Sequence, residues 1–423
     1  MLTEEYESTA DLAAPHAREV IPLLNESAIV RESEWNLGRS KHLDNEILRL
    51  HGLGLKNQQL AFWHAMLLVR QQQGEPALAE IIDLAQQMNG GRFGTDLAAR
   101  TSMWRIELST SQKREIPPAY VEEYLNRVTQ SLRTIPDQPS VCGYLLGYAA
   151  NDLSPDGNAG KCVQGKLDSI FSDKAIPEYV RLSLQGAIEI DIAWNERGGG
   201  WGNEVTEAGA RGFSEHLALA RKFLVKAQAA EPRCPFAASR LITVCRGEGS
   251  GHREEREWFD RAFKATPDFN PAWHNLRQGW LPRWGGSHAD ILALGRLALA
   301  THRFDTEVPY EFIESYETIM QDLSSMEQPL KPFLETPGLW EDILKLYNGY
   351  GAVKSRDELL RQRDQGDFAA LAYRFGKTDV FKKAVLAGGV KEVDGERFSS
   401  WAGVTLEEAM ADLKNPDAKD SGF

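Results

Sequence analysis

The feature that most constrains the fold is a set of three glycine-rich turns, each lying between two segments with helical periodicity. The turns occupy 197–203, 247–251 and 282–287. Prolines recur in step with them, since Pro232 and Pro267, which end the second helices of the first two pairs, stand about 35 positions apart. A helix–turn–helix unit with a period near 34 residues is the tetratricopeptide interval. The middle of the chain is therefore predicted to be a helical-repeat array.

Helical periodicity extends over most of the chain, and strand signals are scarce. The helix pairs expected from the turns are 177–196 with 206–230, 235–246 with 252–266, and 270–281 with 287–301. Three earlier pairs are expected, namely 55–73 with 74–88, 95–108 with 118–132, and 141–150 with 161–171. Shorter helices are expected after residue 301, at 310–323, 338–347, 355–363, 368–373 and 380–386.

These segments predict an all-α fold, a tetratricopeptide-like helix-hairpin solenoid with a smaller C-terminal helical region. The expected domains are a helical lead-in (1–54), the repeat array (55–302, with 177–302 as its tetratricopeptide-like core) and a C-terminal region or cap (303–423).

Small residues support close helix crossings in the core of the array. Ala220, Leu224 and Ala227 precede Pro232 at the small–large–small positions of a tetratricopeptide second helix. A small residue at a crossing lets a large side chain from the neighbouring helix fill the groove. The corresponding positions before Pro267 are Glu255, Phe259 and Ala262, so the match there is partial.

Two motifs in the segment 189–301 carry a resemblance to a known family. The first is an Ala-Trp followed by an Arg-Gly turn, at 193–198, and the second is Pro-Arg-Trp-Gly-Gly-Ser, at 282–287. With these motifs the segment, roughly a quarter of the chain, resembles bacterial proteins that carry a tetratricopeptide-like domain of unknown function. The resemblance implies a helical-repeat fold and adds neither an activity nor a catalytic residue.

The composition excludes several classes of partner. The formal net charge is −13, whereas nucleic acids and anionic membranes attract clustered lysines and arginines. No run approaches the roughly 18 consecutive apolar residues that span a bilayer. The first residues are acidic, without the basic and apolar regions of a signal peptide, so a cytoplasmic location is expected.

The four cysteines are too few for a disulfide framework in a chain of this size. Cys142 could approach Cys162 across one helix hairpin, and Cys234 could approach Cys245 across another. Buried, reduced thiols that act as small apolar residues are the favoured interpretation.

The turn around Trp284 is the sharpest local motif, and it has two interpretations. The indole and the neighbouring Arg283 could hold an aromatic group, a sugar or a carboxylate. Alternatively, Trp284 folds back between helices while Gly285 and Gly286 supply turn conformations, which is the favoured interpretation. Tryptophans elsewhere in the array offer the same choice between binding and packing; they are Trp194, Trp201, Trp273 and Trp280.

No catalytic, metal or cofactor motif withstands inspection. His274, His288 and Asp290 lack the spacing of a metal site or a triad. The segments 155–162 and 198–203 contain glycines but lack a preceding strand and complete phosphate-binding patterns. The expectation is therefore no catalytic residue, no metal and no cofactor.

The function predicted from these observations is a non-enzymatic scaffold that binds a protein or peptide segment, with no nucleic-acid or membrane partner. The alternative is an enzyme that acts on glycans and is built on paired helices closed into a toroid. That alternative requires carboxylates converging on a tryptophan-lined cleft. The partner, the pathway and the oligomeric state do not follow from the sequence.

Overall fold

The computed structural model describes residues 41–55, 58–87, 94–135, 137–155, 160–163, 165–200, 202–356, 358–386 and 395–414. Its regular elements over these ranges are all helices, which confirms the all-α prediction. Apart from Lys41, which groups with the second unit, the described residues divide into a first unit that ends at Gly286 and a second that begins at Ser287. The domain boundary expected from the sequence, between residues 302 and 303, stays a prediction.

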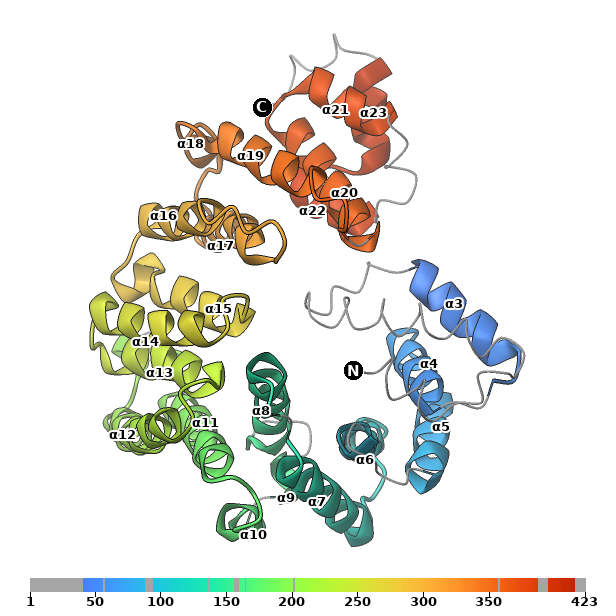
Figure 1. Ribbon diagram of the computed structural model, residues 1–423, viewed down its shortest axis with the longest axis vertical. Coiled ribbons are helices and arrows are strands. Elements are labelled where there is room, and N and C mark those ends of the chain that lie inside the picture. The colour runs from blue at the N-terminus through green and yellow to red at the C-terminus, as the bar shows by residue number, and fades with distance from the viewer. Residues whose placement is uncertain are drawn as a thin grey trace. The chain divides into compact units, whose positions relative to one another are not determined.

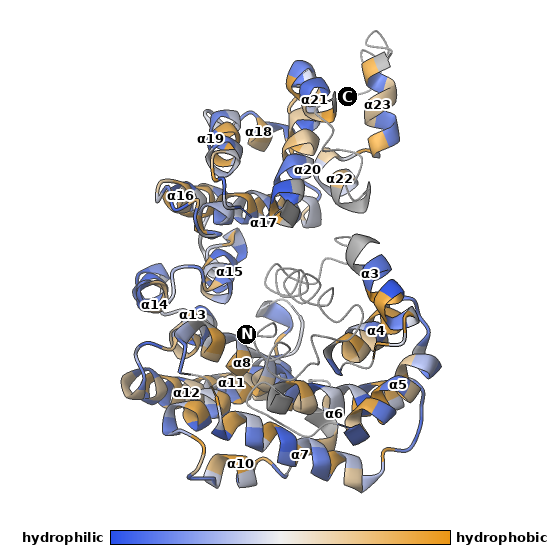
Figure 2. Ribbon diagram, turned by 45° about the vertical axis from the view of Figure 1, so that its right-hand side comes forward, coloured by the Kyte–Doolittle hydropathy of each residue, from blue (hydrophilic) through white to orange (hydrophobic). Residues whose placement is uncertain are grey.

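The first unit consists of helices that pack as neighbours in chain order (Figure 1), especially α4 with α5, α6 with α7, α11 with α12, and α13 with α14. Helices such as α5, α7 and α12 combine hydrophilic and hydrophobic residues (Figure 2), as expected where one face packs on a neighbour. The helices are α3 (Lys41–Gly52), α4 (Gln58–Arg70), α5 (Gly74–Gln87), α6 (Gly94–Ser111), α7 (Pro118–Arg133), α8 (Pro139–Leu153), α9 (Gly160–Val163), α10 (Asp168–Ser172), α11 (Glu178–Arg197), α12 (Glu207–Ala230), α13 (Pro235–Glu248), α14 (His252–Ala265) and α15 (Asn270–Gly279), with 3-10 turns η2 (Gly202–Glu204) and η3 (Pro282–Trp284).

The helix predicted over 161–171 was wrong, because the structure has two short helices, α9 and α10, in its place. Gly165 lies between them with φ +77°. This left-handed conformation is open to glycine and ends a right-handed helix.

Helices α11 and α12 form the most extensive pairing, and local sequence explains their ends. Gly198 ends α11 with φ 77°, and the Thr206 side chain caps α12 by accepting a hydrogen bond from the Gly209 amide at 3.0 Å. At the crossing, Leu224 of α12 faces Gly186 of α11, where an added Cβ would lie 2.5 Å from the leucine Cγ. The predicted fit of large and small residues is present, although Gly186 supplies the small partner.

Glu255 stands where the small–large–small pattern expects a small residue, and the next helix leaves space for its larger side chain. Glu255 is 2% exposed on α14, and a Cβ at Gly279 of α15 would lie 2.9 Å from its Oε2 atom. The glycine thus provides the space that the larger side chain requires.

The second unit begins with α16 (His288–Leu299), which the Ser287 side chain caps by accepting from the Asp290 amide at 3.1 Å. A serine before the first turn, with an acidic residue three positions on, is an ordinary arrangement for the start of a helix. The remaining elements are η4 (Val308–Tyr310), α17 (Glu311–Ser325), α18 (Lys331–Leu334), α19 (Leu339–Gly351), α20 (Glu358–Arg374), α21 (Thr378–Leu386), α22 (Gly395–Ala402) and α23 (Leu406–Lys414).

The two helices predicted at 355–363 and 368–373 are one helix, α20. The gap between the two predicted helices includes Asp367. This residue is 1% exposed and accepts a hydrogen bond from the Tyr310 hydroxyl at 2.8 Å. Gly366 lies in the same stretch, and a glycine within a helix is unfavourable by only about 1 kcal/mol. A tertiary contact such as that of Asp367 can outweigh this cost.

A buried ionic network also holds α20 in the second unit. Arg356 donates to Asp364 at 2.5 Å and to Glu307 at 2.9 Å, and Arg363 donates to Glu307 at 2.7 Å. Because the arginine side chains are only 4% and 6% exposed, each requires these carboxylates to offset its burial. Among the described residues, no helix is long and apolar enough to cross a bilayer.

Candidate functional site

Three aromatic rings and two arginines from four elements of the first unit meet in one group, here called the aromatic–arginine cluster: Trp194 and Arg197 of α11, Phe213 of α12, Arg246 of α13 and Trp284 of η3. The Trp194 ring lies edge-on to Trp284, with 5.7 Å between centroids, and to Phe213, with 4.9 Å. These distances are typical of favourable aromatic pairs.

The chain after α15 folds back to bring Trp284 to this cluster. Gly285 has φ +89°, a conformation that suits glycine. At Gly286 an added Cβ would lie 2.1 Å from the Trp280 carbonyl oxygen, so only glycine fits beside that backbone. Trp284 itself is partly buried. The two glycines therefore position the indole, and the ring keeps some solvent contact.

Arg246 lies over both indoles, with its guanidinium carbon 5.5 Å from the Trp194 ring centroid and 5.7 Å from that of Trp284. Burial lowers the pKa of Arg246 to about 10; Glu255 opposes this shift, and the positive charges of Arg240 and Arg283 add to it. The guanidinium is still charged at neutral pH. Its Nε atom and the Trp194 Nε1 atom have no hydrogen-bond partner among the described residues.

Further arginines make this part of the unit locally basic, against the net charge of the chain. Arg240 of α13 donates to Asp191 of α11 at 3.1 Å. Arg277 of α15 is 1% exposed. Desolvation, and after it the charges of Arg277 and Arg246, lower the pKa of His274, although this residue is exposed. His274 is thus neutral at neutral pH, and the local positive charge comes from arginine.

The binding residues proposed from the sequence occupy different environments in the structure. Trp273 is 2% exposed, and its Nε1 donates to the Pro267 carbonyl at 2.8 Å, so it belongs to the core. Trp280 is partly buried beside the His252 ring, with 6.0 Å between centroids. Arg283 is exposed and donates to Gln278 at 3.4 Å. Trp201 lies outside the described residues.

Sequence reasoning missed the meeting of Trp194 with Trp284, which lie in different helix pairs. Stacking at roughly 10 Å per helix pair predicts that residues two repeats apart stay distant. The fold-back at Gly286 removes that separation. Sequence reasoning also missed Arg246, whose only signal was its place at a helix end before a glycine-rich turn.

A second polar group, here called the His–Glu cluster, joins α3, α4 and α5. His51, His64 and Glu80 bring possible ligand atoms within 4.8 Å of one another. Glu80 Oε2 lies 2.6 Å from His64 Nδ1, and Glu80 Oε1 lies 3.3 Å from His51 Nε2. The imidazole rings stack 3.6 Å apart at 7°. A metal lies close to the plane of each imidazole that binds it, and two stacked parallel planes do not share such a point. The arrangement therefore fits a hydrogen-bonded cluster better than a metal site.

No family model, curated protein or solved structure matches this chain. The resemblance to a tetratricopeptide-like domain of unknown function consequently stays an expectation from the two motifs.

Proposed function

We propose that residues 177–302 include a tetratricopeptide-like interaction module that binds an acidic peptide or protein segment at the aromatic–arginine cluster. The proposed role is non-enzymatic, as expected from the sequence. Within the expected class of protein or peptide partners, the proposed partner is one that presents carboxylates. The cytoplasmic location expected from the sequence belongs to the same proposal.

The observation that carries the proposal is the position of Arg246. Its guanidinium lies over two indoles, and its Nε has no hydrogen-bond partner among the described residues. A buried cation is unfavourable without a partner, so a carboxylate that reaches the guanidinium gains a charge-assisted hydrogen bond. Of the nearby carboxylates, Asp191 pairs with Arg240, whereas the buried Glu255 acts on Arg246 through its charge and makes no hydrogen bond to the Arg246 Nε atom.

Trp194 and Trp284 supply the apolar part of the recognition. Aromatic rings beside arginine are common at the centre of protein interfaces, because they provide large contact areas with few rotatable bonds. The glycan-acting alternative requires two carboxylates on opposite sides of a bond, either about 5–5.5 Å or about 6.5–9.5 Å apart. Asp191 is ion-paired and Glu255 is buried, so these two do not form the pair of carboxylates that hydrolysis requires. The arrangement therefore favours binding over hydrolysis.

The test uses a short dye-labelled peptide of alternating glutamate and serine, and a matched peptide with glutamine in place of glutamate. Fluorescence anisotropy measures the affinity of each for the full chain. We expect the glutamate peptide to bind more tightly, and Arg246→Gln to weaken it about tenfold to hundredfold, the equivalent of one hydrogen bond to a charged group.

Arg253→Gln is the matched control, because the Arg253 side chain is 94% exposed and pairs with Glu257 of its own helix. Binding by this variant should equal that of the wild type, and circular dichroism should show that both variants remain helical. Equal affinity for the two peptides, or an undiminished affinity in Arg246→Gln, contradicts the proposal. Tighter binding of single-stranded DNA of similar length would also contradict it.

A further inference from the structure

Two cysteines that are distant in sequence meet at the ends of two helices. Cys142 is the fourth residue of α8, and Cys234 is the N-cap residue of α13. Their Sγ atoms are 3.5 Å apart, and the residues are 2% and 3% exposed. The sequence had instead suggested neighbours within one hairpin, Cys142 with Cys162 and Cys234 with Cys245.

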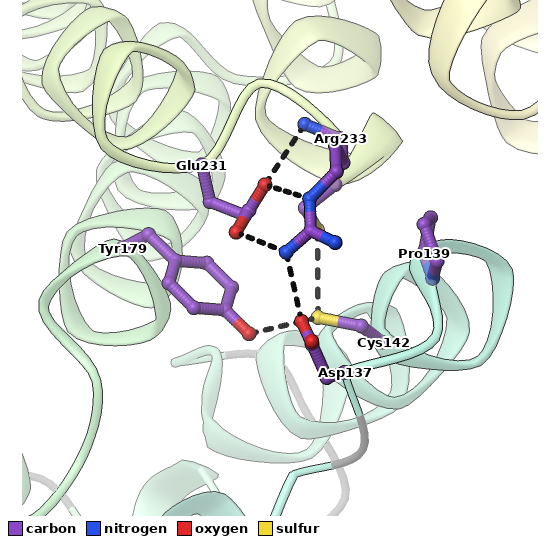
Figure 3. Close-up of a pocket in the computed structure, with 7 residues that line it drawn as sticks. Asp137, Pro139, Cys142, Tyr179, Glu231 and Arg233 are labelled. Atoms are coloured by element: carbon purple, nitrogen blue, oxygen red, sulfur yellow. Dashed lines mark hydrogen bonds and ion pairs between the residues drawn. The ribbon is translucent and has the colours of Figure 1, made fainter.

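A small pocket adjoins the two thiols, and Figure 3 draws the residues that line it. The Tyr179 hydroxyl lies 3.5 Å from the Cys142 sulfur. Arg233 donates to Glu231 at 2.9 Å and to Asp137 at 3.0 Å, as the dashed lines show. The Arg233 and Asp137 side chains are 61% and 82% exposed, so this ion pair borders the pocket at the protein surface.

The surroundings make one sulfur more acidic than the other. The hydrogen bond from the Cys234 thiol, and more weakly that from Tyr179, lower the pKa of Cys142 although burial raises it. The pKa of Cys234 is raised by the same hydrogen bond and by burial. Burial also raises the pKa of Tyr179, so its hydroxyl keeps its proton and can donate. Cys142 is the thiolate that these contacts favour, and the thiolate is the nucleophilic form.

We propose that Cys142 and Cys234 are a hydroperoxide-reactive thiol pair, in which Cys142 attacks the oxidant and Cys234 resolves the product. The Cys142 thiolate attacks one peroxide oxygen, the O–O bond breaks, and the leaving hydroxide takes a proton from solvent to become water. Cys142 is then a sulfenic acid. The Cys234 sulfur loses its proton, attacks the Cys142 sulfur and displaces hydroxide, which that proton converts to water.

The balance of these steps is two thiols and one hydrogen peroxide to one disulfide and two waters. Two electrons pass from the sulfurs to the peroxide oxygens. Condensation of a sulfenic acid with a neighbouring thiol is the ordinary course of this chemistry. The product would join α8 to α13 covalently.

The pocket sets the class of oxidant. It has room for about one water-sized group, a space that a single oxygen of hydrogen peroxide can occupy and a bulky disulfide cannot. The other two thiols differ from the pair. Burial raises the pKa of Cys245 to about 12, which disfavours its thiolate. Cys162 is half-buried and serves as a comparison thiol.

The experiment treats the reduced full chain with one equivalent of hydrogen peroxide, blocks the remaining thiols and maps the peptides by mass spectrometry. We expect an intramolecular disulfide between Cys142 and Cys234. In the Cys234→Ser variant, oxidation of Cys142 should stop at the sulfenic acid, which dimedone traps. In the Cys142→Ser variant, Cys234 should carry no dimedone adduct.

Cys162→Ser is the matched control and should give the same disulfide at the same rate. Tyr179→Phe should move the pH midpoint of dimedone labelling in the Cys234→Ser background upward, because the thiolate loses a donor. Circular dichroism of each serine variant checks that it is folded. If the Cys142–Cys234 disulfide is absent in the folded wild type, or if Cys162 oxidises first, the proposal is overturned. Equal rates with hydrogen peroxide and with oxidised glutathione would also overturn it.

Discussion

Replacing Trp273 with alanine should strongly destabilise the first unit, because this ring lies between α14 and α15. The residue is 2% exposed, and its ring lies edge-on to Phe259, with 4.7 Å between centroids, and to Phe263, with 5.7 Å. Truncation of a buried tryptophan typically costs about 3–5 kcal/mol. The Pro267 carbonyl also loses the indole hydrogen bond at 2.8 Å. An unpaired buried acceptor adds about 1–3 kcal/mol if water does not reach it.

The expected loss for Trp273→Ala is therefore about 5 kcal/mol in the free energy of unfolding. Trp273→Phe keeps most of the ring packing and removes the indole N–H, so its expected loss is smaller, about 1–2 kcal/mol. Urea denaturation followed by far-ultraviolet circular dichroism gives both values. In a repeat array the neighbouring helices should unfold together with the altered one.

Two outcomes would refute this reasoning. A loss below about 1 kcal/mol for Trp273→Ala would mean that the ring is not part of the core. Equal losses for the alanine and phenylalanine variants would mean that the hydrogen bond, and not the packing, dominates. Trp284→Ala is the matched comparison and should lose less, because Trp284 is only partly buried.

Three further predictions concern packing, pH and metal. Gly186→Ala should destabilise by about 1–2 kcal/mol in urea denaturation, because the clash with Leu224 outweighs the better helix propensity of alanine; a gain in stability would contradict the crossing. Burial raises the pKa of Glu254, but the hydrogen bond from Arg221 at 2.5 Å and further contacts hold it below its usual value. The Glu254 carboxylate thus stabilises the fold above its unfolded-state pKa of about 4.3, and this contribution is lost as pH falls through the lower folded pKa. In an acid titration of stability, Glu254→Gln should lack this pH-dependent loss. An acid profile equal to that of the wild type would contradict the prediction. Elemental analysis of the native protein should find no stoichiometric zinc, because the stacked rings of the His–Glu cluster do not share a ligand plane; one equivalent would show that the cluster binds metal after all.

Local sequence was a good guide wherever neighbouring residues determine the structure. The Ser287 cap and the glycine-dependent turn at 285–286 depend on residues close in the chain, and the turn was predicted. The predicted break before residue 368 failed because a contact from Tyr310, distant in sequence, stabilises Asp367 within α20.

The candidate sites were harder to predict, because their residues meet only through the path of the folded chain. Trp194 and Trp284 each belong to a recognisable motif, yet neither motif shows that the turn after α15 folds back toward α11. Cys142 and Cys234 come from α8 and α13, and spacing alone does not pair them. Helical periodicity describes which residues face a neighbour; it does not say which distant helix becomes that neighbour.

Charge reversal at Arg283 tests the central claim most directly. This residue is exposed and its charge acts on Arg246, so Arg283→Glu should leave stability within about 0.5 kcal/mol. Anisotropy titrations with the glutamate–serine peptide and a lysine–serine counterpart measure the effect. If acidic segments bind at the aromatic–arginine cluster, the variant binds the glutamate peptide more weakly and the lysine peptide more tightly than the wild type. Unchanged affinities for both peptides would contradict the account.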